Sequence, residues 1–129
     1  MPPAVRVVLV EDNDVFRESL ELLLTLRGDL QIVAAEPDGA NAVEICRAHR
    51  PDVLVIDYRL PGADGVQVTE AVRRACPEVA VVALTAAAGE REAEALLAAG
   101  AAECVRKDEP LERIVSAIRR AAGSGLAAA

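Results

Sequence analysis

The segment VLVIDYRLPGADG, from Val53 to Gly65, places an acid at the end of an apolar run. Four apolar residues, three of them β-branched, lead directly to Asp57, and the chain then reaches the turn residues Leu60-Pro61-Gly62. A short continuous apolar run bounded by turn residues is typical of a strand that is covered on both faces. We therefore predict a buried strand over 53–56 that ends at a carboxylate and is followed by a sharp turn.

Similar apolar runs recur along the chain and alternate with helical patterns. Strands are predicted over 5–10, 30–35, 53–56, 79–84 and 103–106, and helices over 14–27, 40–49, 64–76, 89–99 and 110–122. Strands separated by single helices run parallel, and right-handed crossovers place helices on both faces of the sheet. The pattern predicts an α/β fold, a doubly wound (βα)5 sandwich over 4–122, with 123–129 as a linker or disordered tail.

Composition excludes several classes of function. A net charge of −7 in 129 residues argues against a surface that grips nucleic acid by itself. No apolar run approaches the roughly 18 residues of a membrane span, and the N-terminus lacks the pattern of a signal peptide, so we expect a cytoplasmic protein without membrane contact. The three cysteines match no metal-binding spacing and are expected to be structural thiols.

Polar side chains follow the predicted strands where each strand ends. Glu11 and Asp12 follow the first strand, Asp57 the third, Thr85 the fourth and Lys107 the fifth. Ligands of open parallel sheets bind at the carboxyl ends of the strands. We therefore expect three carboxylates, a hydroxyl group and an ammonium group to meet at one edge of the sheet.

This set of groups suits phosphoryl transfer to a carboxylate. Crowded carboxylates repel one another, and Mg²⁺ relieves the conflict because it prefers oxygen ligands. Asp57 could accept the phosphoryl group. The oxygens of the transferred group would then need positively charged groups beside them. Glu11 and Asp12 would form the metal site, Lys107 the counter-charge and Thr85 a sensor, although Asp12 could also cap the first helix.

Lys107 is the only lysine in the chain, which contains thirteen arginines. The sequence uses arginine wherever else a basic side chain occurs. A lysine provides a compact point charge that an arginine does not. The single lysine at the end of the last strand therefore indicates that this position requires an ammonium group.

Four segments together resemble the receiver domain of bacterial two-component response regulators. They are VVLVED, VLVIDYRLPGADG, VVALTA and GAAECVRKD, in which 45, 28 and 22 positions separate Asp12, Asp57, Thr85 and Lys107 in turn. The resemblance covers nearly the whole chain. It implies a flavodoxin-like fold whose five parallel strands lie in the order 2-1-3-4-5.

The resemblance also implies roles for the site residues. A sensor histidine kinase would phosphorylate Asp57, with Lys107 paired to the acceptor and Thr85 moving toward the phosphoryl group. Asp12 and Asp57 would bind Mg²⁺ directly, together with the backbone carbonyl of Arg59. Glu11 would act on the metal through water.

The sequence departs from the family pattern at two positions. Cys104 replaces the usual tyrosine or phenylalanine three residues before the lysine, so either the two states differ less than usual or another element reports the phosphorylation. Asp108 replaces the usual proline after Lys107, and the bond between them could be cis or trans.

The residues indicate a regulatory switch that is not itself an enzyme, and two other functions compare with it. A phosphatase with an aspartyl-phosphate intermediate needs an acid two residues after the nucleophile, and Arg59 occupies that position. A phosphorylation-independent module for binding or dimerisation remains the alternative. The ending IRRAAGSG resembles receivers that continue into a helix-turn-helix domain, so we expect DNA binding only through such an absent output domain, and possible homodimer formation on phosphorylation.

Overall fold

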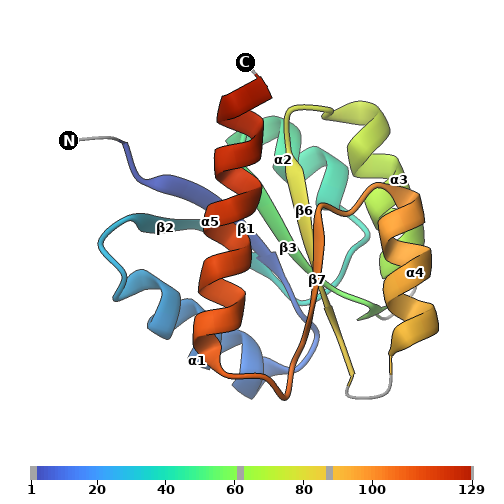
Figure 1. The fold of residues 1–129 in the computed structure, drawn as a ribbon, viewed down its shortest axis with the longest axis horizontal. Coiled ribbons are helices and arrows are strands. Elements are labelled where there is room, and N and C mark those ends of the chain that lie inside the picture. The colour runs from blue at the N-terminus through green and yellow to red at the C-terminus, as the bar shows by residue number, and fades with distance from the viewer. Residues whose placement is uncertain (1–2, 61–62, 87–88, 129) are drawn as a thin grey trace.

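A parallel sheet forms the centre of the computed structural model, which describes residues 3–60, 63–86 and 89–128. Its strands lie in the order β2-β1-β3-β6-β7 and neighbouring strands run parallel (Figure 1). The strands are β1 (Val5–Val10), β2 (Leu30–Glu36), β3 (Val53–Asp57), β6 (Ala80–Thr85) and β7 (Glu103–Arg106). The predicted order is confirmed, because the numbers 4 and 5 belong to two short strands outside this sheet.

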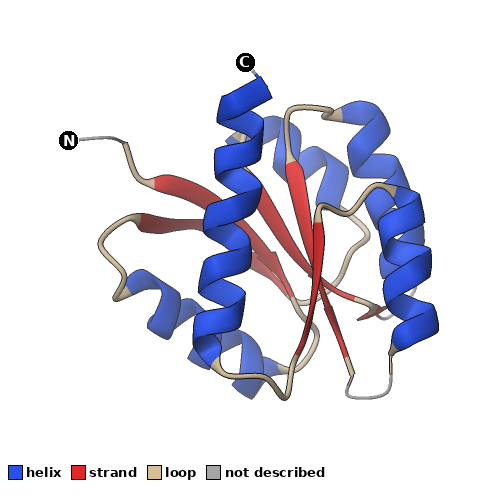
Figure 2. Cartoon of the chain, in the orientation of Figure 1, coloured by secondary structure: helices blue, strands red, loops and turns tan. Residues whose placement is uncertain are grey.

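Helices cover both faces of the sheet, as predicted (Figure 2). They are α1 (Asp14–Thr25), α2 (Ala42–His49), α3 (Gly65–Ala75), α4 (Glu90–Ala99) and α5 (Leu111–Ala128). Buried residues of α1 and α5 pack in one core, and those of α2, α3 and α4 pack in the other. In Figure 1 the carboxyl ends of the strands lie at the lower edge, where α1 and α5 begin.

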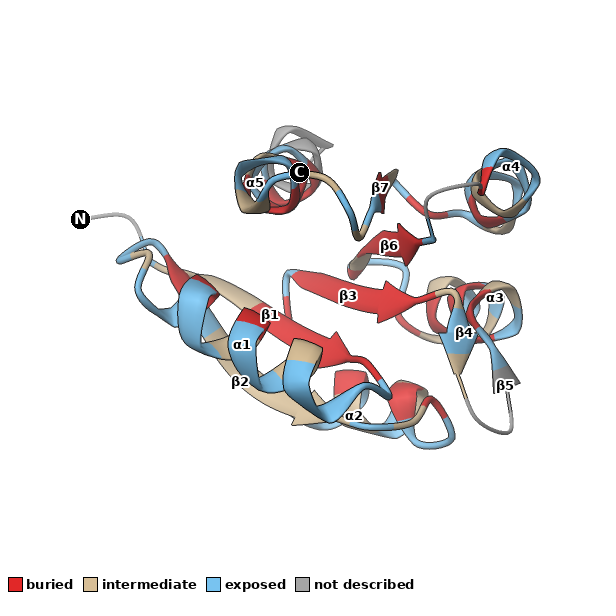
Figure 3. Ribbon diagram, turned by 90° about the horizontal axis from the view of Figure 1, so that it is seen from below, coloured by how far each residue is buried: buried red, intermediate tan, exposed pale blue. Residues whose placement is uncertain are grey.

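Strand β3 belongs to both halves of the core, and all five of its residues are buried (Figure 3). Val53 and Val55 pack on the side of α1 and α5. Leu54 and Ile56 pack on the opposite side, against α2, α3 and α4. Successive side chains of a strand point to opposite faces, so an unbroken apolar run fits a strand that is covered twice. Asp57 ends the strand and is only 5% exposed.

Polar side chains and a glycine mark the ends of three helices. Asn13 caps α1, since its side chain accepts a hydrogen bond from the backbone N–H of Phe16 at 2.9 Å. Asp12 is therefore not the residue that caps this helix. Asp64 caps α3 in the same way, and Gly100 ends α4 with a left-handed φ of 114°.

The structure differs from the prediction at the end of α5 and after Asp57. Helix α5 continues to Ala128 instead of ending near 122, because an alanine-rich segment extends a helix that is already nucleated. Two short strands, β4 (Arg59–Leu60) and β5 (Ala63–Asp64), form an antiparallel pair that the sequence did not predict. The predicted turn extends to residues 61 and 62, which lie outside the described residues.

The structure also bears on one peptide bond and on the character of the helices. No cis peptide bond occurs in the described residues, so the bond between Lys107 and Asp108 is trans. Within the same ranges, none of the helices is long and apolar enough to cross a membrane.

Candidate functional site

Three carboxylates meet at the carboxyl edge of the sheet, as predicted. Glu11 and Asp12 follow β1, and Asp57 ends the adjacent strand β3. Because β1 and β3 are parallel with Val10 opposite Ile56, Glu11 and Asp57 reach the same level of the sheet. One oxygen from each of the three residues lies within 4.8 Å of the others. Glu11 is fully buried, whereas Asp12 is exposed, so the cluster opens to solvent on one side.

The ammonium of Lys107 joins this cluster from the loop after β7. Its Nζ lies 3.0 Å from Oδ2 of Asp57 and also contacts Oε1 of Glu11. The backbone N–H of Lys107 donates to the carbonyl of Thr85 at 2.8 Å, which fixes the start of the loop to the end of β6. The charged end of the single lysine is therefore placed between two carboxylates from different strands.

The crowding of acids changes how these groups bind protons. Burial raises the pKa of Glu11 to about 7, although Lys107 opposes this rise. A hydrogen bond with the Glu11 side chain lowers the pKa of Asp12. Burial disfavours the charge of Lys107, but the Glu11 and Asp57 carboxylates outweigh it and raise the pKa of the ammonium. One ammonium thus faces three acids, and a further cation would be bound favourably.

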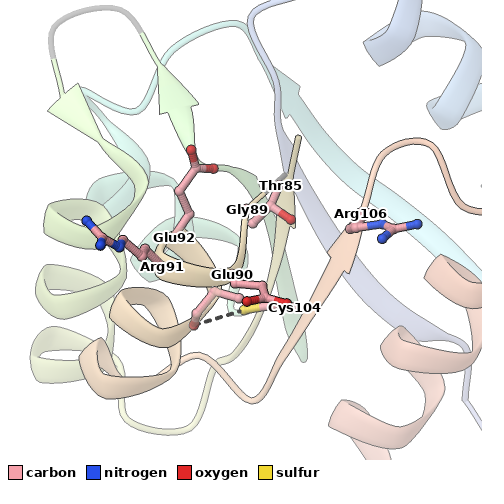
Figure 4. Close-up of a pocket in the computed structure, with 8 residues that line it drawn as sticks. Thr85, Gly89, Glu90, Arg91, Glu92, Cys104 and Arg106 are labelled. Atoms are coloured by element: carbon pink, nitrogen blue, oxygen red, sulfur yellow. Dashed lines mark hydrogen bonds between the residues drawn. The ribbon is translucent and has the colours of Figure 1, made fainter. Parts of the chain in front are cut away.

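Thr85 ends β6 and is 2% exposed, on the edge of a separate hollow of about 690 Å³ (Figure 4). The hollow lies between α4 and the ends of β6 and β7. Cys104 lines it, and its thiol donates to the carbonyl of Ala93 at 3.6 Å. Burial raises the pKa of this thiol. Open space therefore borders Thr85 where the resemblance leads us to expect an aromatic ring.

In the part of the chain that the structure describes, no side-chain hydrogen bond joins Thr85 to the carboxylates. The structure therefore brings Glu11, Asp12, Asp57 and Lys107 together and leaves Thr85 beside them without a direct side-chain link. The backbone of Arg59 lies next to the acceptor, since its N–H donates to Oδ1 of Asp57 at 3.3 Å.

Comparison with known proteins gives the family. Residues 7–119 match the family described as "Response regulator receiver domain". The chain belongs to the response regulator receiver family. Such domains are regulatory and are generally not enzymes. The resemblance expected from the four sequence segments is confirmed.

Several relatives of this receiver domain are regulators of transcription. "Probable transcriptional regulatory protein NarL" of Mycobacterium tuberculosis is 39% identical over 117 residues, which are 91% of this chain and 54% of NarL. "Response regulator GacA" of Pseudomonas viridiflava is 33% identical over 89% of this chain and 54% of GacA. The chain therefore spans about half the length of these relatives.

Solved structures confirm the flavodoxin-like fold. The receiver domain of NarL from Mycobacterium tuberculosis superposes with a TM-score of 0.89 at 38% identity and covers 95% of this chain and 98% of that chain. A LuxR-family response regulator from Aurantimonas gives a TM-score of 0.88 at 28% identity, with 94% and 86% of the two chains covered.

Other residues that support the receiver site were missed by the sequence analysis. Arg17 donates to the backbone carbonyl of Glu11 at 2.8 Å, and the N–H of Asn13 donates to Oε2 of Glu11 at 3.2 Å. The ring of Phe16 lies against the Lys107 ammonium. These contacts connect the first turn of α1 to the strand ends. The local sequence pattern does not indicate these contacts, because they depend on how α1 packs against the sheet.

Gly65 positions the acceptor strand through close approach rather than through a left-handed turn. A Cβ atom at this position would lie 2.8 Å from the Cα of Tyr58 and 2.9 Å from the carbonyl oxygen of Asp57. Both neighbours are backbone atoms that cannot rotate away. The start of α3 therefore packs directly against the chain that leaves the acceptor.

Gly65→Ala is expected to lower the free energy of unfolding by about 2 kcal/mol, because overpacking of this size strains the backbone. It should also slow phosphorylation, since the strain falls on Asp57. Urea unfolding and intact mass after incubation with a phosphodonor measure the two effects. Gly123→Ala is the matched control: a Cβ there meets no atom within 4 Å, and alanine favours the helix. Equal stabilities of the two variants would contradict this account.

Proposed function

We propose that this receiver domain is phosphorylated on Asp57 by a sensor histidine kinase, with Mg²⁺ bound at the acidic cluster, and that the phosphoryl group switches dimerisation or the activity of an output domain. The observation that carries the proposal is the position of Asp57. Its carboxylate lies 3.0 Å from the Lys107 ammonium, and one of its oxygens lies within 4.8 Å of oxygens of Glu11 and Asp12.

The donor set of the cluster fits Mg²⁺. Three carboxylate oxygens lie within 4.8 Å of one another, and hard oxygen ligands are those that this ion prefers. Oε1 of Glu11 is buried and makes no well-aligned hydrogen bond in the described part of the chain, although the Lys107 ammonium contacts it. Asp12, Asp57 and the carbonyl of Arg59 would hold the ion, and Glu11 would reach it through water. When bound, the ion would neutralise charge on the transferred phosphoryl oxygens.

The residues of the chain have distinct parts in the transfer. An oxygen of Asp57 forms the new bond to phosphorus while the bond from phosphorus to the donor nitrogen of the kinase histidine breaks. The Lys107 ammonium, already beside Asp57, stabilises negative charge on the transferred group. The Thr85 hydroxyl can donate to a phosphoryl oxygen once Thr85 moves toward the phosphoryl group.

The relatives favour regulation of transcription as the output. NarL and GacA are named as regulators, and this chain spans only about half of each. We therefore propose that phosphorylation of this domain controls a DNA-binding output domain. The alternative of a phosphorylation-independent binding module draws on Cys104, which leaves a hollow where an aromatic reporter would be.

Removal of the metal tests the proposed function directly. Incubation with acetyl phosphate and Mg²⁺ is expected to add one phosphoryl group, seen by intact mass, because the cation offsets repulsion between the acids and the donor. The same incubation with EDTA should leave the mass unchanged, and added Mg²⁺ should restore the gain. A folded, Mg²⁺-supplied protein that never gains mass would favour the phosphorylation-independent module.

A further inference from the structure

The Lys107 ammonium has a third neighbour besides the two carboxylates. Its Nζ lies 4.9 Å from the centre of the Phe16 ring. A cation within about 6 Å of an aromatic centroid is attracted by the negative face of the ring. Phe16 belongs to the first turn of α1, and α1 begins beside the loop that leads to α5 (Figure 1). The ring and the carboxylates therefore contact the ammonium from separate elements of the fold.

The position of the ring is fixed by the same cap that touches the acidic cluster. Asn13 accepts a hydrogen bond from the N–H of Phe16 at 2.9 Å, and its own N–H donates to Glu11 at 3.2 Å. The ring also packs against the core between α1 and α5. Phe16 is therefore held in place independently of Lys107.

The lysine side chain needs such a constraint. It has a flexible four-carbon stem, and 27% of its surface remains exposed. An ammonium with access to water can turn away from Asp57 toward solvent. The Phe16 ring excludes water from the part of the ammonium that it covers, and it attracts the positive charge. It does so without adding a negative group that would repel an incoming phosphoryl group.

We propose that Phe16 is a positioning residue for Lys107: its ring holds the ammonium against Asp57, so that positive charge is in place where the phosphoryl group arrives. The kinetic part of this inference rests on the proposed function, whereas the contact between ring and ammonium does not. Phe16 itself touches no reacting atom.

The surroundings of the ring allow a conservative replacement. A small cavity of about 150 Å³ lies between α1 and α5, and both Phe16 and Lys107 line it. A tyrosine or tryptophan ring at position 16 therefore has space beside it. Leu23 lines the same cavity, which makes Leu23→Ala a control for changes in packing alone.

The first measurement uses the fact that the chain has one lysine and one phenylalanine. Protein labelled with ¹³C-lysine gives a single set of side-chain signals, all from Lys107. The protons next to Nζ are expected to be shifted upfield by the Phe16 ring, and Phe16→Leu should remove this shift while Leu23→Ala preserves it. An unshifted signal in the wild type would overturn the inference, whether or not the protein can be phosphorylated.

The second measurement is the rate of phosphorylation by acetyl phosphate at saturating Mg²⁺. Phe16→Leu is expected to slow the reaction roughly fivefold, which is the loss of about 1 kcal/mol typical of an exposed cation–π contact. The phosphorylation rate of Phe16→Tyr should stay within about twofold of the wild-type rate. The rate of Leu23→Ala should equal that of the wild type.

The outcomes separate the two proposals. A wild type that takes up no phosphoryl group contradicts the proposed function, and the lysine signals then still test the contact. A phosphorylated wild type whose rate equals that of Phe16→Leu overturns the positioning role. Equal slowing in the leucine and tyrosine variants overturns it as well, because a general packing defect does not distinguish an aromatic ring from an aliphatic side chain.

Discussion

Asp57→Asn is expected to take up no phosphoryl group from acetyl phosphate and Mg²⁺ under conditions in which the wild type gains one. The amide keeps the size of the side chain but removes the nucleophilic carboxylate. It also removes one of the three acids that would bind the metal and weakens the attraction for Lys107. Intact mass spectrometry measures the result, and circular dichroism checks that the variant is folded.

The matched control is Asp38→Asn. Asp38 is partly exposed, and its side chain accepts a hydrogen bond from the N–H of Ala40, which an asparagine oxygen can also accept. This variant should gain the same mass as the wild type. Phosphorylation of Asp57→Asn to the wild-type extent would show that another residue accepts the group, and the assignment of Asp57 would be wrong.

The free energy of unfolding is expected to fall by about 3 kcal/mol between about pH 5 and pH 8 in the absence of Mg²⁺. Burial raises the pKa of Glu11 from the ordinary 4.5 to about 7 in the folded protein. Between these values the folded state holds a proton that the unfolded chain has released, so stability declines as the pH rises. The pKa values of Asp12 and Asp29 are lowered, so these groups change the free energy of unfolding only at pH values below this range. Urea unfolding at a series of pH values, with EDTA, measures the decline.

Glu11→Gln provides the control for this pH dependence. The amide cannot ionise, so its stability should be nearly independent of pH over the same range. Saturating Mg²⁺ should restore stability to the wild type at pH 8, and the gain should be smaller in the variant, which keeps Asp12 and Asp57 but lacks the charge of Glu11. A wild type whose stability rises toward pH 8 without metal would contradict the raised pKa of Glu11.

Much of the fold could be predicted because the decisive patterns are local. The apolar run before Asp57 indicates a strand covered on both faces, and the alternation of strands with helices determines that the sheet is parallel. Parallel topology then places every strand end at one edge. For this reason Glu11, Asp12, Asp57 and Lys107 could be brought together before any coordinates were known.

The features that escaped prediction depend on contacts between elements distant in the sequence. The ring of Phe16 meets Lys107 only because α1 and the loop before α5 lie side by side. The pairing of β4 with β5 joins two strands of only two residues each, which are too short for a pattern in the sequence to indicate them. The need for glycine at position 65 arises from the close approach of Tyr58, which lies seven residues earlier on the chain that leaves β3.

Strand β3 contributes residues to both cores and carries Asp57 at its end. This double membership has a consequence for mutational tolerance. A substitution at Leu54 or Val55 disturbs one core directly and shifts the acceptor at the same time, whereas a substitution at an exposed position, such as Val15 on α1 or Leu26 just after it, does neither. In a saturation library, the smallest fraction of functional substitutions should therefore be found along β3. Residues of this strand that are needed for folding directly precede Asp57, which is needed to accept the phosphoryl group.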